Sequence, residues 1–223
     1  MKTQQLILVL FFFGINSIFP QQFHQLADAV IEKDTAKINQ LLQSGVDINI
    51  QDETSGTTVL MIASSYYYYE DIVEFLISNG ADVNLKDKEG KTALLWAASN
   101  SLPNAKILIK NHANVNSAAN DGMTAFLQAT LGVSSGKVTI EMCDLLRKKG
   151  ANINAALTKK SAMGWTAIHY AAINGDAALV KYLIKHGANT NKATGEGSSP
   201  LYLAKLGNHE EVISILKKAG AKE

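Results

Sequence analysis

The sequence predicts an all-α protein assembled from a repeated pair of helices, and three observations support this prediction. A motif of the form Gly-x-Thr-x-x-x-x-Ala, with Ser replacing Thr in the last copy, starts at glycines 56, 90, 122, 164 and 197. A second apolar stretch follows each copy and ends, in most copies, in Gly-Ala-x-x-Asn or a close variant. Apolar residues make up 47% of the 223 residues and charged residues 18%, so a sizeable core can be buried. A recurring period of about 33 residues is typical of stacked helical repeats.

The first twenty residues predict a secretory signal peptide. Lys2 precedes an apolar run over residues 6–15, after which the chain turns polar. Ten apolar residues at a rise of about 1.5 Å span only about half of a hydrocarbon core. We therefore expect residues 1–20 to be removed by a cut between residues 17 and 22, and no membrane span to remain. An uncleaved anchor or a buried first helix is the alternative.

The first helix of each repeat is expected to begin just after the Thr or Ser that recurs at the third position of the motif. A Thr or Ser hydroxyl can accept a hydrogen bond from an amide of the first helical turn, which has no partner within the helix. The alanine that ends the motif removes side-chain bulk, so neighbouring helices can approach closely. The expected capping residues are Thr58, Thr92, Thr124, Thr166 and Ser199.

The second helix is expected to bury one stripe and to end at a glycine. Ile72, Val73, Leu76 and Ile77 share one helical face. Glycine adopts the left-handed backbone conformation of a helix C-cap without strain. In one copy His112 takes the place of this glycine, and it would need a positive φ, which is strained for a residue with a side chain. The Asn side chains after each cap can bond the loop backbone and hold a hairpin finger.

These motifs resemble the ankyrin repeat, whose consensus carries Gly-x-Thr-Pro-Leu-His-x-Ala-Ala in the first helix and Gly-Ala-Asp-Val-Asn after the second. The resemblance covers residues from about 23 to 221, although the consensus proline survives only at Pro200. It implies an all-α ankyrin-repeat α-solenoid of helix-turn-helix repeats with short β-hairpin fingers. The implied domain covers residues 21–223, with repeats at 23–50, 51–85, 86–117, 118–155, 156–192 and 193–223.

Two insertions interrupt the period in the third full copy of the motif. Five extra residues fall near 132–136, between the two helices, and four more lengthen the finger at 155–163. Insertions in repeat arrays map to loops and sometimes to binding surface. The other interpretation is that the extra residues are a tolerated sequence change without a function.

The sequence contains no constellation of residues typical of an enzyme or a metal site. The five histidines lack the spacing of metal ligands, and Gly90-Lys91-Thr92 lacks the first glycine of a phosphate-binding loop. His169 occupies the consensus His slot and is expected to be a hydrogen-bonded structural residue. Cys143 falls on the buried stripe of a second helix and is expected to act as a small core hydrophobe. We expect no catalytic residue, no metal and no cofactor.

The charge balance argues against a nucleic-acid partner. The chain has 21 Lys and Arg against 20 Asp and Glu, without long runs of one sign. The mixed charge of the expected finger tips favours a protein partner instead. The ankyrin resemblance implies a monomer in solution, with self-association through exposed tyrosines as the alternative.

The resemblance implies that finger tips and exposed first-helix positions contact the partner along a concave side. Carried over by position, the candidates are Glu53, Thr54, Lys88, Glu89, Lys91, Asn100, Asp121, Met123, Trp165 and Asn174. Tyr66, Tyr67 and Tyr68 are added because four consecutive rings at 66–69 cannot all enter a core, so one or two should be exposed. Tyrosine and tryptophan are enriched among residues that dominate binding energy.

The predicted function is a non-catalytic protein-binding module, or an inhibitor or immunity-type partner, that acts in the periplasm through its concave face. The periplasm follows from the signal peptide together with the resemblance, since exported ankyrin proteins are mainly bacterial. A host-directed, extracellular effector is the alternative, and an enzyme is the least favoured reading.

Overall fold

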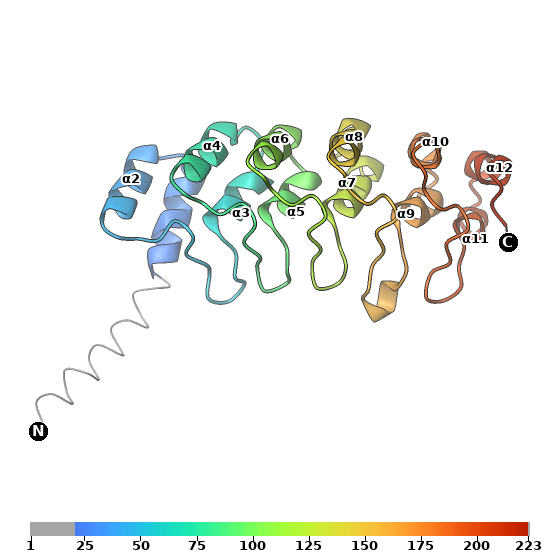
Figure 1. The fold of residues 1–223 in the computed structure, drawn as a ribbon, viewed down its shortest axis with the longest axis horizontal. Helices are drawn as coiled ribbons and strands as arrows, with labels where there is room; N and C mark the ends of the chain where they lie inside the picture. The colour runs from blue at the N-terminus through green and yellow to red at the C-terminus, as the bar shows by residue number, and fades with distance from the viewer. Residues whose placement is uncertain (1–20, 223) are drawn as a thin grey trace, which may run out of the picture.

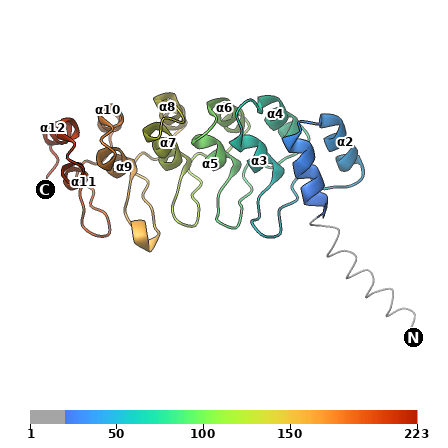
Figure 2. The same ribbon diagram turned by 180° about the vertical axis from the view of Figure 1, so that it is seen from behind.

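The computed structural model describes residues 21–222, so the predicted signal peptide lies outside the described residues. The helices form two parallel layers, and hairpin-shaped fingers extend from the side of the inner layer (Figures 1 and 2). The inner helices are α3 (Val59–Ser65), α5 (Ala93–Ala98), α7 (Ala125–Ser134), α9 (Ala167–Ile173) and α11 (Pro200–Leu206). The outer helices are α2 (Thr35–Gln43), α4 (Glu70–Ser78), α6 (Leu102–Lys110), α8 (Ile140–Lys148), α10 (Ala177–Lys185) and α12 (Glu210–Lys218), and residues 21–31 form the helix before α2. The predicted all-α solenoid is confirmed.

The fingers are hairpin loops rather than paired strands in the described part of the chain. Isolated antiparallel bridges join Gln51 to Thr58 and Ala118 to Thr124. The second insertion lies in such a finger, where a short 3-10 helix, η1 (Lys160–Ala162), sits near its tip.

Helix capping follows the predicted positions at four of the five motif copies. Thr58, Thr124 and Ser199 each accept a hydrogen bond from the amide three residues later. The prediction is wrong at Thr92, which makes no such bond. Thr166 caps its helix together with His169 in a capping box, in which the His169 Nδ1 lies 3.1 Å from the Thr166 amide and 2.9 Å from the Thr166 hydroxyl.

The ends of the outer helices have the predicted left-handed geometry. His112 adopts a φ of 68°, as its slot requires. The glycines in the equivalent slots also have positive φ; they are Gly45, Gly80, Gly150, Gly187 and Gly220.

One apolar core runs between the two layers from residue 23 to residue 216. The motif alanines 63, 97, 129 and 171 are fully buried, which agrees with close helix approach. Cys143 is also fully buried, and burial raises the pKa of its thiol to about 12. It is the core residue that its position predicts.

The first insertion is partly helical. Helix α7 has ten residues whereas α3 and α9 have seven, so residues 132–134 extend the helix and only the following residues form a loop. The expectation that the extra residues lie between the helices is therefore only partly correct. Gly132 permits this path because it packs directly against Ser99 at the end of α5.

Candidate interaction surface

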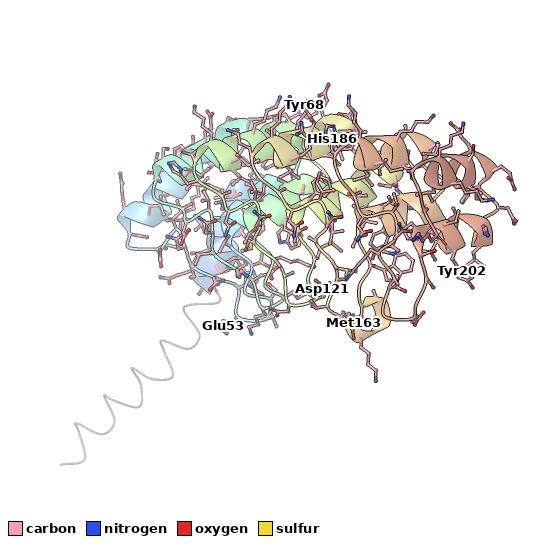
Figure 3. All side chains as sticks on the ribbon, turned by 45° about the vertical axis from the view of Figure 1, so that its right-hand side comes forward. Glu53, Tyr68, Asp121, Met163, His186 and Tyr202 are labelled. Carbon is pink, nitrogen blue, oxygen red and sulfur yellow. The ribbon has the colours of Figure 1, made fainter. Side chains whose placement is uncertain are left out.

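The finger tips and the inner helices form one surface, which we call the inner face. Figure 3 shows Glu53, Asp121 and Met163 along the edge made by the fingers, whereas Tyr68 and His186 lie at the opposite side of the molecule. Three open hollows lie on the inner face, one between fingers and two over the inner helices.

The hollow between the fingers has a volume of about 450 Å³ and carries both signs of charge. Its lining residues are Lys88, Glu89, Lys91, Asn120, Asp121 and Lys159. Adjacent fingers are bonded to one another at this level: the Asn120 amide donates to the Glu89 carbonyl at 2.8 Å, and the Thr158 amide donates to the Asp121 carbonyl at 2.8 Å. These backbone bonds hold the finger tips in a fixed arrangement.

The two hollows over the inner helices share Ser99, Gln128 and Lys137, so they form one continuous depression that we call the central groove. Its parts have volumes of about 230 and 560 Å³. The remaining lining residues are Lys91, Leu95, Trp96, Asn100, Leu131, Gly132, Ser134, Ser135 and Asn174. Lys91 also lines the finger hollow, which makes the two regions contiguous.

The wall of the central groove combines an aromatic ring with polar side chains. The Lys91 ammonium lies 5.9 Å from the centre of the Trp96 ring and 2.5 Å from a Glu89 carboxylate oxygen. Gln128 donates a hydrogen bond to the Ser99 hydroxyl at 3.1 Å. The buried indole N–H of Trp96 has no hydrogen-bond partner.

Six of the predicted contact residues line these hollows: Lys88, Glu89, Lys91, Asn100, Asp121 and Asn174. Glu53 and Thr54 are exposed at a neighbouring finger tip, outside the hollows. Met123 and Trp165 are half-buried. The Trp165 ring packs 5.0 Å from the ring of Tyr170 and 6.0 Å from that of His169, so part of its surface is used within the fold.

The tyrosine cluster, which we define as Tyr66 to Tyr69, occupies the turn between α3 and α4 and does not line the hollows. Tyr66, Tyr67 and Tyr68 are 43, 52 and 80% exposed, so three rings rather than one or two reach solvent. Only Tyr69 is held inward, because its hydroxyl donates to the Ile31 carbonyl at 2.7 Å and its ring stacks on Tyr66. The turn is too short to cover the other rings.

Sequence reasoning missed several groove residues, of which Lys137 is the most prominent. Gln128 was also not predicted, whereas Ser135 in the groove and Lys159 in the finger hollow fall within the two insertions. The signal that could have identified Lys137 was its position directly after the first insertion. The course of that loop over the groove depends on packing between repeats, which the repeat pattern does not encode.

Two titratable side chains on this side of the molecule have pKa values shifted by their surroundings. Hydrogen bonds from Ser55 and Thr54 lower the pKa of Asp52 to about 2, which keeps this finger carboxylate charged. Burial lowers the pKa of His169, whose Nε2 lies 2.9 Å from the Lys192 carbonyl. His169 thus ties α9 to the segment that follows α10, as expected for a structural histidine.

Residues 21–222, which the structure describes, contain no group of three or more His, Cys, Asp or Glu side chains placed to hold a metal ion. None of their helices has the length and apolar character required to span a bilayer.

Comparisons with known proteins agree with the repeat pattern. A family model described as ankyrin repeats (3 copies) matches residues 26–119, 65–156 and 131–223. Notch-regulated ankyrin repeat-containing protein B of Danio rerio is 42% identical over 53 residues, which cover 24% of this chain and 48% of that protein. Protein glp-1 of Caenorhabditis elegans is 32% identical over 85 residues, and intracellular phospholipase A2 of the same organism is 42% identical over 77 residues. These matches cover 36% and 32% of this chain, and 7% of each relative. The chain therefore spans about half the length of the Notch-regulated relative and a small part of the longer proteins.

Proposed function

Because this chain belongs to the ankyrin repeat family, we propose that it is a non-catalytic module that binds another protein through its inner face. Ankyrin repeats indicate a protein–protein interaction module. We choose the inner face because the finger hollow and the central groove are continuous: Lys91 lines both. An extended surface with few deep pockets suits a protein partner better than a small substrate.

Site-specific photo-crosslinking tests this choice of surface. A photoreactive phenylalanine derivative replaces Asn100 or Asp121 on the inner face, or, as matched controls, Glu74 or Lys181 on the outer helices. We expect one protein to be crosslinked from the inner-face positions in living cells and not from the outer ones. Crosslinks formed only from the outer positions would contradict the proposal.

The finer part of the proposal is that the protein acts after export, in the periplasm, as a binding or inhibitory partner of the immunity type. Lys2, the apolar run at 6–15 and the polar residues that follow support export. Fractionation of the producing cell followed by N-terminal sequencing tests it: the mature chain should start between residues 18 and 23 and lie in the periplasm. Recovery from the medium would favour the host-directed effector instead, and an intact chain in the cytosol would exclude both.

A further inference from the structure

Lys137 is held over the central groove by contacts that arise from the first insertion. Its amide donates to the Gly132 carbonyl at 2.9 Å, and its carbonyl accepts a hydrogen bond from the Tyr67 hydroxyl at 2.7 Å. Tyr67 belongs to the turn after α3, whereas Lys137 follows α7, so this bond passes over the intervening α5–α6 pair. Both backbone polar groups of Lys137 are therefore fixed.

Close packing at Gly132 brings α7 against the end of α5 and the loop against α7. A Cβ atom on Gly132 would lie 2.8 Å from Cγ2 of Val138 and 3.0 Å from Cα of Ser99. Gly132 of α7 therefore lies between Val138 of the loop and Ser99 at the end of α5, and only glycine fits there. This explains how a lysine from one repeat lines a hollow whose aromatic wall, Trp96, belongs to the preceding repeat.

The central groove has a local positive charge although the whole chain is nearly neutral. Lys91 and Lys137 line it, and no acidic side chain does. The other lining polar groups are neutral hydroxyls and amides. Glu89 contacts Lys91 but lies in the finger hollow, where its own side chain is well exposed to solvent. Exposed ion pairs contribute little, so this contact leaves Lys91 available to a second carboxylate.

The ring of Trp96 forms the wall of the groove beside Lys91. Its buried Nε1–H has no acceptor, which is unfavourable in a folded protein.

We propose that the central groove binds an acidic peptide segment of the protein partner, with side-chain carboxylates between Lys91 and Lys137, and that Tyr67 is a positioning residue for Lys137. This inference rests on the proposed function, since it names the chemistry of what the inner face binds. A peptide is favoured over a nucleic acid because Glu89 and Asp121 adjoin the groove. These carboxylates would repel a continuous phosphate backbone, but they tolerate a peptide that is acidic only where it meets the groove.

Binding of a defined probe, followed by NMR, tests the inference. The chain has two tryptophans, Trp96 in the groove wall and Trp165 outside the hollows, so their indole N–H signals report separately. A short peptide of alternating Glu and Ser is titrated into ¹⁵N-labelled protein, with the Gln–Ser peptide and oligothymidine as comparison probes. We expect the acidic peptide alone to shift the Trp96 indole signal, with no shift at Trp165.

Charge variants locate the binding site. Lys91→Gln and Lys137→Gln should each weaken binding of the acidic peptide by about three- to tenfold. The matched controls are Lys106→Gln and Lys110→Gln, which alter exposed lysines in a basic hollow on the outer helices α6 and α8. These controls should leave the affinity unchanged. Tyr67→Phe should weaken binding and shift the Lys137 amide signal without changing the melting temperature by more than the control variants do.

Other results would overturn the inference. Equal binding of the Gln–Ser peptide would remove the role of charge, and an equal Trp96 shift with oligothymidine would favour a nucleic acid. Loss of binding only in Lys106→Gln or Lys110→Gln would place the anion on the outer helices. If the acidic peptide fails while inner-face crosslinks to a partner are found, the acidic segment is wrong and the proposed function stands; if both fail, the proposed function fails as well.

Discussion

Tyr68 is the residue at which side-chain exposure and backbone strain coincide. Its φ is 60° and its side chain is 80% exposed. The same place in the helix-to-helix turn holds Gly175, with a φ of 70°, in a later repeat. A bulky residue with positive φ is uncommon, and the left-handed conformation costs about 1–2 kcal/mol for a residue other than glycine.

Replacing Tyr68 by glycine should therefore stabilise the fold. We expect Tyr68→Gly to raise the free energy of unfolding by about 0.5–1 kcal/mol, because relief of the strained φ outweighs the added entropy of the unfolded chain. Urea denaturation measures the change. Tyr67→Gly is the control, since Tyr67 has no positive φ, and it should not stabilise. A Tyr68→Gly protein that is less stable than the original would show that the ring contributes contacts.

His169 makes stability depend on pH. Burial is the main cause of its lowered pKa, and the positive charge of Lys192 acts in the same direction. Because the folded-state pKa lies below the ordinary value of about 6.5, the unfolded chain binds the proton more readily. The stability contributed by neutral His169 is therefore present above pH about 6.5 and is lost as the pH falls below it.

His169→Leu tests this dependence, because Leu95 and Leu127 occupy the same slot in other repeats. We expect the variant to be less stable at pH 7.5, since the bonds to Thr166 and Lys192 are lost, but to lose less stability between pH 7 and pH 5. Melting temperatures across this pH range measure both effects. An unchanged slope would assign the pH dependence to another group.

At the scale of single elements, asparagine side chains connect each outer-helix end to the next repeat. The side chain of Asn116 donates to the Gly150 carbonyl at 2.9 Å and accepts from the Asn152 amide at 2.9 Å. The equivalent residues that also span to the next repeat are Asn49, Asn84, Asn154 and Asn191. The expectation that asparagines bond the loop backbone holds for Asn114, Asn152 and Asn189, which accept from the amide two residues later, whereas the second asparagine of each loop bridges to the next repeat.

Removing one bridge should weaken the interface between repeats. Asn116→Ala deletes two hydrogen bonds at a solvent-exposed position, so we expect a loss of about 1–2 kcal/mol in the free energy of unfolding. Asn79→Ala is the matched control, because its side chain bonds only the Phe75 carbonyl of its own helix. Urea denaturation compares the two variants. Equal losses of stability in the two variants would mean that a bond between repeats stabilises the fold no more than a bond within one helix.

At the scale of the whole molecule, contacts in a helical solenoid usually join nearest neighbours only. The packing of the inner helices follows that rule, since α3 contacts α5, α5 contacts α7, α7 contacts α9 and α9 contacts α11. The bond between Tyr67 and Lys137 departs from it by linking repeats on either side of the α5–α6 pair. This link lies beside the central groove, so it restrains the part of the array that we propose contacts the partner.

The sequence by itself determined the repeat, the order of helices, the buried stripes and the left-handed slot at His112. These features follow from the local conformational and burial preferences of residues that recur at a fixed spacing. Each copy of the repeat supports the same assignment in its neighbours. Six predicted contact residues lie together in the hollows because the repeat frame places equivalent positions side by side. Only the tertiary structure decided that Lys137 joins Lys91 and Trp96 in one groove, that three tyrosines stay exposed and that the asparagines bridge repeats. These three features depend on packing between segments that are distant in sequence. They are the course of an inserted loop, the burial of the side chains in a turn and the bonding partner of a loop side chain. No local sequence pattern specifies such packing.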